Sequence, residues 1–215
     1  MILGGSVTHI AVFRLNVKRS LDLIDTHSQL HNKQGKPKTV VSDIMRAAVV
    51  MVVSAVDAYL HGLLSDYVER SAQLTPPPGA LLELVKEWRL DAKDTLPYLL
   101  NKKGPAEFRQ RVVEHFADRT LQDPSKVELV GRVLGVEGLW EQIANGLGKS
   151  EDRARKDFAA VVKRRHQIAH EADLDPAGKT ATKKRRLTRQ EADAAVDEIN
   201  KVAEQLQTIF EAKYP

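Results

Sequence analysis

The chain has 215 residues, of which 42% are hydrophobic, so it holds enough apolar material to bury a substantial core, which argues against a disordered protein. Cysteine is absent, which excludes disulfides, zinc–thiolate sites and a cysteine nucleophile and suits a reducing compartment. The 33 basic and 29 acidic residues give a net charge of +4, which permits a polyanionic partner without requiring one.

The N-terminal part of the chain predicts a long helix over residues 7–31, which the segment NKQGKPK then ends. We expect its inward face to be formed by Val17, Leu21, Ile24 and Leu30. The first residues, MILGGSVTHIAVFRLN, have no positively charged region ahead of an apolar run. We therefore expect no secretory signal and a cytoplasmic protein.

A second helix is predicted over residues 39–72, before the three prolines of TPPPG end it. It contains the most apolar stretch of the chain, IMRAAVVMVVSAVDAYL, in which the only polar residues are Arg46, Ser54 and Asp57. A bilayer span needs about 20 apolar residues, and an ionisable group near its middle is unfavourable there. The stretch therefore predicts a central core helix and no membrane contact.

The region 75–147 predicts shorter helices and is interpreted as a helical insertion within a single domain of residues 1–215. Ser125 and Glu128 have the spacing of a capping box, which predicts a helix start at that point. The expected helices span about residues 80–90, 95–102, 105–118, 125–134 and 136–147.

Two more long helices follow, over about residues 151–172 and 189–213. Thr188 and Glu191 form a second capping-box signal. One face of the last helix carries Ala195, Ile199, Val202, Leu206 and Ile209. No run of alternating residues framed by hairpin turns is found, so the predicted fold class is all-α, a bundle of the four longest helices with the insertion packed on it.

The sequence RRHQIAHEAD, residues 164–173, lies at the end of the predicted 151–172 helix. At about 100° per residue, Arg165 falls in the middle of an apolar stripe formed by Phe158, Val161, Val162, Ile168 and Ala169. His166 and His170 lie together at the border of this stripe, one turn apart. A guanidinium cannot lose its proton, so Arg165 must meet an acid, an anionic ligand, water in a cleft or another subunit.

Spacing alone leaves a structural and a functional interpretation of Arg165 open. It could form an ion pair with Asp57, or extend its charge to the edge of the core. The partner of Asp57 could equally be a tyrosine. If Asp57 does pair with Arg165, it could orient that side chain toward a cleft, so Asp57 is retained as a supporting site residue. Arg164 and Glu171 are interpreted as surface residues.

The two histidines could also be read as metal ligands together with Glu171 and Asp173. The pattern is not the HExxH arrangement and no third ligand is evident, so we predict neither a metal site nor a cofactor. The loop after the motif carries a short basic run, interpreted either as a solvated loop or as a weak contact to a phosphate backbone, at Lys183, Lys184, Arg185 and Arg186.

The stretch from Arg165 to His170 matches the arginine, polar residue, three variable residues and histidine that mark the HEPN superfamily of helical domains. Three segments, in chain order, resemble the RiboL-PSP type of HEPN domain: DIMRAAVVMVVSAVDAYLHGLL (43–64), LWEQIA (139–144) and VVKRRHQIAHEADLDP (161–176). The resemblance covers most of the chain from about residue 40. Family members often have asparagine where His166 stands, and histidine is also an accepted polar residue there.

This resemblance implies a metal-independent endoribonuclease that dimerises so that two motifs face each other across a basic cleft. Arg165 and His170 would be the catalytic pair, and His166 would orient the scissile phosphate or the partner motif. RNA would be the substrate, and a toxin or antiphage-defence setting, with an antitoxin or a defence-system partner, would fit the superfamily. The alternative is a catalytically inactive HEPN domain that binds RNA or a nucleotide or serves in dimerisation.

Overall fold

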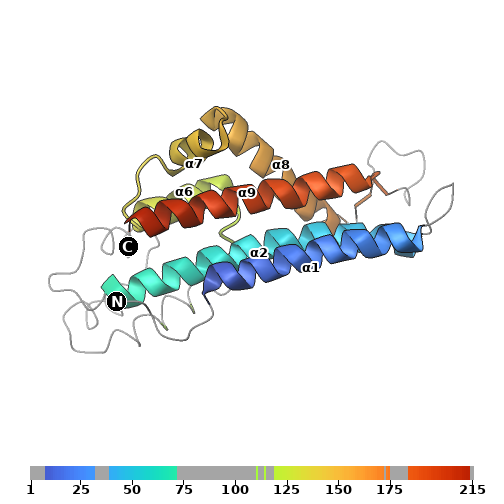
Figure 1. Ribbon diagram of the computed structural model, residues 1–215, viewed down its shortest axis with the longest axis horizontal. Helices are drawn as coiled ribbons and strands as arrows, with labels where there is room; N and C mark the ends of the chain where they lie inside the picture. Colours follow the sequence, from blue (N-terminus) through green and yellow to red (C-terminus); the bar gives the residue numbers. More distant parts are fainter. Residues whose placement is uncertain are drawn as a thin grey trace. The chain divides into compact units, whose positions relative to one another are not determined.

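The computed structural model describes residues 8–31, 39–71, 110, 114, 119–171, 173–174 and 184–213. Within these ranges the ordered elements are helices, and the only β pairing is an isolated antiparallel bridge between Leu174 and Lys184. The all-α prediction is therefore confirmed (Figure 1). The helices expected near residues 80–90 and 95–102 lie outside the described residues, as does almost all of the one expected at 105–118.

The chain divides into two compact units, one formed by residues 1–56 and 141–215 and the other by residues 57–140. Helix α2 (Thr39–Ser71) begins in the first unit and continues into the second, and α7 (Leu139–Leu147) also crosses the division. The arrangement as a single domain with 75–147 as an insertion stays a prediction.

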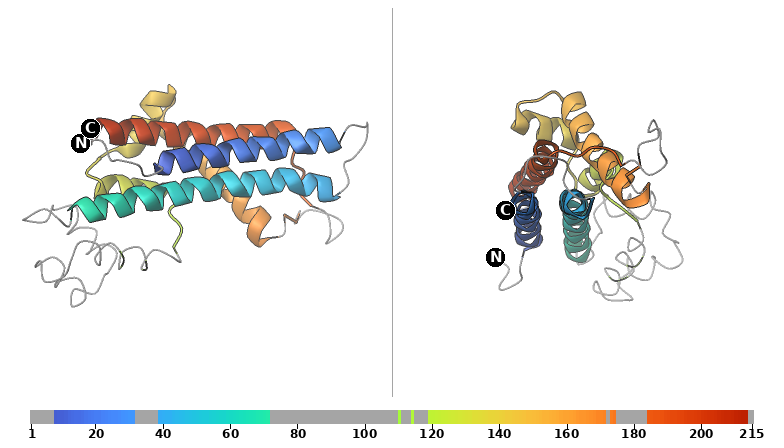
Figure 2. Two further views of the ribbon diagram at one scale, coloured as in Figure 1. Left: turned by 60° about the horizontal axis from the view of Figure 1, so that its bottom comes forward. Right: turned by 90° about the vertical axis from the view of Figure 1, so that its right-hand side faces the viewer.

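In the first unit, α1 (His9–Leu30) packs against α9 (Arg189–Lys213), and the first half of α2 runs alongside α1 (Figures 1 and 2). The buried face of α1 follows helical spacing through Ile10, Phe13, Val17, Ser20, Ile24 and His27. The prediction that Leu21 and Leu30 face inward is wrong, since they are 42% and 60% exposed. They lie beside the buried face in the helical turn, and the polar side chains of Ser20 and His27 are buried there.

Helix α9 follows the predicted pattern closely. Ala195, Ile199, Val202 and Leu206 are buried as expected, and Ile209 is half-buried. The predicted capping box at its start is also confirmed. The Thr188 backbone N–H donates to Glu191 Oε2 at 2.7 Å, and the Glu191 N–H donates to Thr188 Oγ1 at 3.2 Å.

Part of α2, Val41–Val68, is long and apolar enough to cross a bilayer by length and composition, but more than half of its most apolar window is buried within the protein. Met45, Val49, Val52 and Val53 are at most 2% exposed. Arg46, the one arginine within this stretch, has a buried acidic partner described below. This degree of burial is that of a core helix, which supports the prediction from the sequence that α2 is a central core helix.

In the second unit, α6 (Pro124–Val133) is capped by Asp123 and not by the predicted Ser125. The Asp123 carboxylate accepts the Ser125 backbone N–H at 2.8 Å, and proline occupies the first helical position, where its missing N–H leaves no hydrogen bond unmade. Helix α7 begins at Leu139, three residues later than expected, because Gly138 has a positive φ of 59° that interrupts the helical path.

Candidate functional site

The candidate site lies at the C-terminal end of α8 (Glu151–His170), which packs against α9. The helix begins at Ser150, whose hydroxyl accepts the Arg153 backbone N–H at 3.3 Å. Its first half is anchored in the core by the buried side chains of Ala154 and Phe158. The large apolar side chains of its second half are only half-buried, and these are Val161, Val162 and Ile168. The motif therefore belongs to the less covered half of the helix.

Arg165 occupies the unusual position that its place in the apolar stripe predicted. Its side chain is half-buried, and its Nε atom is buried without any hydrogen-bond partner. Among the described residues, no acid forms an ion pair with its guanidinium. A buried, permanently charged N–H group without a partner is unfavourable, so this side chain is suited to receive an acceptor from a bound ligand.

His166 and His170 lie on the outer side of the same turn. Both are exposed, and their ring centroids are 4.7 Å apart with the rings tilted by 41°. Lys163, also exposed, lies one turn earlier on this face at helical spacing. Two imidazoles and a lysine therefore face solvent beside the turn that carries Arg165.

Asp57 belongs to the second compact unit and has local partners there. Its Oδ1 accepts the Leu121 backbone N–H at 2.5 Å, and its Oδ2 lies 3.9 Å from His61 Nε2. The partners of the Asp57 carboxylate are thus a backbone amide and a histidine, whereas the sequence suggested an arginine or a tyrosine. Its support of Arg165 stays a prediction.

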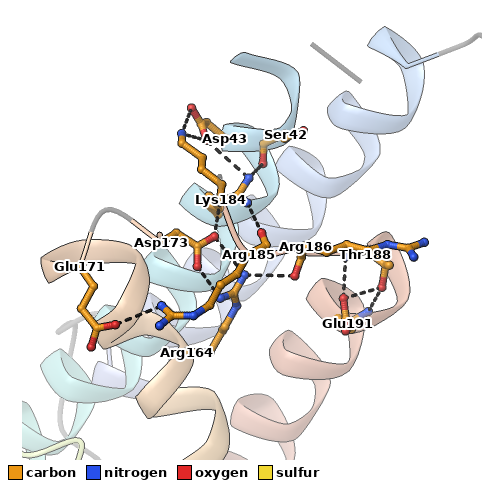
Figure 3. A network of polar contacts seen from close by, with 11 residues as sticks. Ser42, Asp43, Arg164, Glu171, Asp173, Lys184, Arg185, Arg186, Thr188 and Glu191 are labelled. Carbon is orange, nitrogen blue, oxygen red and sulfur yellow. Dashed lines mark hydrogen bonds and ion pairs between the residues drawn. The ribbon is translucent and has the colours of Figure 1, made fainter. Parts of the chain in front are cut away.

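A buried ion-pair network ties the motif helix to α2 (Figure 3). Asp173, only 1% exposed, accepts Arg46 Nε at 2.5 Å and is held at both carboxylate oxygens by Arg164. The interpretation of Arg164 as a surface residue is therefore wrong. Its guanidinium turns inward because a buried carboxylate lies next to the helix end, and a buried charge needs a partner.

Most of the basic run described by the structure is already paired. Lys184 Nζ lies 2.8 and 2.9 Å from the two oxygens of Asp43, and Arg185 Nη1 donates to Glu171 Oε2 at 3.0 Å (Figure 3). Arg186 is exposed, and Lys183 lies outside the described residues. A phosphate that binds Lys184 or Arg185 would therefore compete with an existing ion pair.

Glu191, in the first turn of α9, lies close to two arginines of this region. The pKa of Glu191 is below its ordinary value, first because the Thr188 backbone N–H donates to its carboxylate and also because Arg164 and Arg186 are close by. Among the described residues, no group of three or more His, Asp or Glu side chains gathers to hold a metal ion.

The sequence alone predicts no site role for Arg46, and it offers Asp173 only as a possible metal ligand. Arg46 and Asp173 lie 127 residues apart in the chain, so no local pattern joins them. A signal for Arg46 was present, because a single arginine within the most apolar stretch of a protein requires a buried anion. Which acid would supply that anion depends on the fold.

The comparison with known protein families agrees with the all-α fold. The chain matches the family model described as RiboL-PSP-HEPN over residues 15–212. It matches no curated protein and no solved structure significantly. HEPN domains are commonly ribonucleases, so the match suggests a nuclease or another RNA-related function. The chain therefore belongs to the RiboL-PSP-HEPN family of all-α domains.

Proposed function

We propose that this protein is a metal-independent endoribonuclease that cleaves RNA by attack of the 2′-hydroxyl on the adjacent phosphate. Arg165 and His170 are the catalytic pair, and His166 positions the phosphate. The enzyme works as a homodimer in the cytoplasm, in a toxin or antiphage-defence setting, where an antitoxin or another defence protein would restrain it. The observation that carries this proposal is the buried Nε of Arg165, which has no hydrogen-bond partner.

The residue types suit the reaction. In RNA cleavage the bond between the 2′-oxygen and phosphorus forms, and the bond between phosphorus and the 5′-oxygen breaks. A histidine accepts the 2′-hydroxyl proton or supplies a proton to the leaving 5′-oxygen, since its unperturbed pKa is about 6.5. An arginine stabilises the negative charge that grows on the phosphorane. The products are a 2′,3′-cyclic phosphate, which hydrolysis opens to a 3′-phosphate, and a 5′-hydroxyl.

The placement of these side chains supports a site completed by a second copy. The Arg165 Nε is buried, whereas both motif histidines are exposed. Arg165 makes no hydrogen bond to either of them. The half-covered apolar side chains on the second half of α8 offer a surface on which another copy of this helix would pack. Two motifs would then supply histidines and arginines to one phosphate.

The decisive experiment incubates purified protein with labelled RNA and with DNA of the same sequence, each with and without EDTA. We expect RNA cleavage in EDTA and no DNA cleavage, because DNA lacks the 2′-hydroxyl. Arg165→Ala and His170→Ala should each remove most of the activity. Lys156→Ala is the matched control, since Lys156 lies on the same helix and forms an exposed pair with Asp152.

Three results would overturn the proposal. The first is a folded wild type that cuts no RNA under any condition and shows no toxicity on expression. If that protein still binds RNA or dimerises, it is the inactive HEPN module named as the alternative. The second is a His170→Ala variant as active as the wild type. The third is activity lost in EDTA, which would indicate a metal-dependent hydrolase.

Light scattering tests the dimer, and a monomer at micromolar concentration would contradict the shared site.

A further inference from the structure

We propose that Asp173 is a positioning residue for the motif, and that it fixes the last turn of α8 so that Arg165, His166 and His170 are presented in one orientation. This inference rests on the proposed function for its catalytic consequence. Its structural part, the order of that turn, can be measured without any activity. Four observations on the described residues around Asp173 carry it.

The first observation is the backbone at the end of α8. Asp173 has a positive φ of 56°, a left-handed conformation that aspartate and asparagine tolerate better than most residues. This turn directs its N–H back to the Gln167 carbonyl, at 2.9 Å. The Glu171 N–H donates to the same oxygen at 3.2 Å. Gln167 lies inside the motif, so the hydrogen bond from the Asp173 N–H caps the C-terminal end of α8 at the motif itself.

The second observation is the side chain. The Asp173 carboxylate accepts hydrogen bonds from Arg164, the neighbour of Arg165 in the chain, and from Arg46 on α2. Arg46 is itself buried, with 8% of its side chain exposed. A carboxylate held by two guanidinium groups from two helices fixes α8 against α2 at the motif.

The third observation is that Asp173 and its two arginine partners also hold residues 185–186, the segment that lies beside the motif. The Arg185 N–H donates to the Asp173 carbonyl at 2.7 Å, and Arg46 Nη2 donates to the Arg185 carbonyl at 2.6 Å. Arg164 Nη2 reaches the Arg186 carbonyl at 3.3 Å (Figure 3). Both arginines that hold Asp173 therefore also hold the segment beside the motif.

The fourth observation is the weak anchoring of the motif turn by its own side chains. From residue 166 to residue 170 no side chain is buried, and both histidines and Ala169 are exposed. A helix end without core contacts frays, and an error of about 1 Å in a reacting group lowers the rate by about 100-fold. The order of this turn thus depends on the contacts that Asp173 makes.

The test compares Asp173→Asn and Asp173→Gly with the wild type and with Asp197→Asn. Both Asp173 variants permit the left-handed backbone, so they remove the carboxylate and leave the turn geometry accessible. Asp197 is the control because its pair with Lys201 on α9 is exposed. We expect Asp173→Asn to lower kcat for RNA cleavage roughly 10- to 100-fold with little change in KM. The control should match the wild type.

Amide hydrogen exchange and the imidazole NMR signals of His166 and His170 provide readouts that need no activity. Protection of residues 167–171 should fall in Asp173→Asn, and the two histidine signals should shift or broaden, while residues 154–160 keep their protection. Should the Asp173 variants fail to fold, Arg46→Met removes one of the two arginines and should give a smaller effect of the same kind.

The outcomes separate the two proposals. A wild type that cleaves no RNA contradicts the proposed function, and the exchange and NMR data then decide the positioning role alone. Unchanged protection and unchanged histidine signals in Asp173→Asn would overturn that role. So would a variant that raises KM and leaves kcat intact, because the carboxylate would then affect RNA binding and not the geometry of the reacting groups.

Discussion

Replacing Arg46 by methionine tests whether the buried ion pair stabilises the first unit. Methionine keeps much of the apolar stem, so the change removes mainly the guanidinium. Asp173 would lose the donor at 2.5 Å and keep only Arg164, and the Arg185 carbonyl would lose its donor at 2.6 Å. Hydrogen bonds to charged groups contribute about 1.5–3 kcal/mol each, and two of them are lost, so we expect a loss of at least about 3 kcal/mol.

The assay is urea unfolding followed by helical circular dichroism and by tryptophan fluorescence. The two probes must coincide for a single free energy of unfolding to be defined, because the chain forms two compact units. Arg14→Met is the matched control. Two nitrogens of Arg14 also donate to one carboxylate, that of Glu204. The Arg14 side chain, however, is 55% exposed. An exposed pair contributes up to about 1 kcal/mol, so the control should lose less.

Two results would contradict this prediction. If Arg46→Met is as stable as the wild type within the error of the measurement, the buried pair does not stabilise the fold. If Arg14→Met loses as much as Arg46→Met, burial is not what distinguishes the two pairs, and the ranking by exposed fraction fails.

Three further predictions concern stability. Thr188→Ala should destabilise the start of α9 by about 1 kcal/mol in urea unfolding, because the Glu191 N–H loses its acceptor, and Thr188→Ser should restore most of it. Burial and nearby positive charge hold the pKa of His27 below 6.5, so the unfolded chain binds the proton more readily and stability falls as the pH drops below about 6.5. His27→Leu should reduce that pH dependence of the urea midpoint; an identical dependence in the variant would contradict it. Gly131→Ala should destabilise the second unit by about 1–3 kcal/mol, since its Cβ would lie 2.7 Å from Leu139 Cδ2, and an unchanged melting temperature would show that the contact relaxes.

The long helices could be predicted from the sequence because each carries its own signals. Helix α9 has a capping box at Thr188 and an apolar stripe of constant spacing, and both are found in the structure. Errors arose where two signals competed. Ser125 and Glu128 had the spacing of a capping box, but Asp123 followed by proline is the stronger helix start. On α1, hydrophobicity alone placed Leu21 inward, although the contact face passes through Ser20.

The candidate site was predictable in part. The position of Arg165 within an apolar stripe is a property of spacing, and the structure shows the buried, unpaired Nε that this position implies. The family was also recognisable from sequence segments, and its model matches residues 15–212. The catalytic roles of Arg165 and His170 stay predictions until RNA cleavage is measured.

Helical periodicity and capping are local properties, so the all-α class, the extents of the long helices and the anomaly at Arg165 could all be predicted from the sequence. Which charges form pairs became visible only in the packed fold. It turned Arg164 inward to Asp173, brought Arg46 to the same carboxylate from 127 residues away, and paired Lys184 with Asp43. Ion pairing depends on distance in space, and the chain brings these groups together only after its helices have packed.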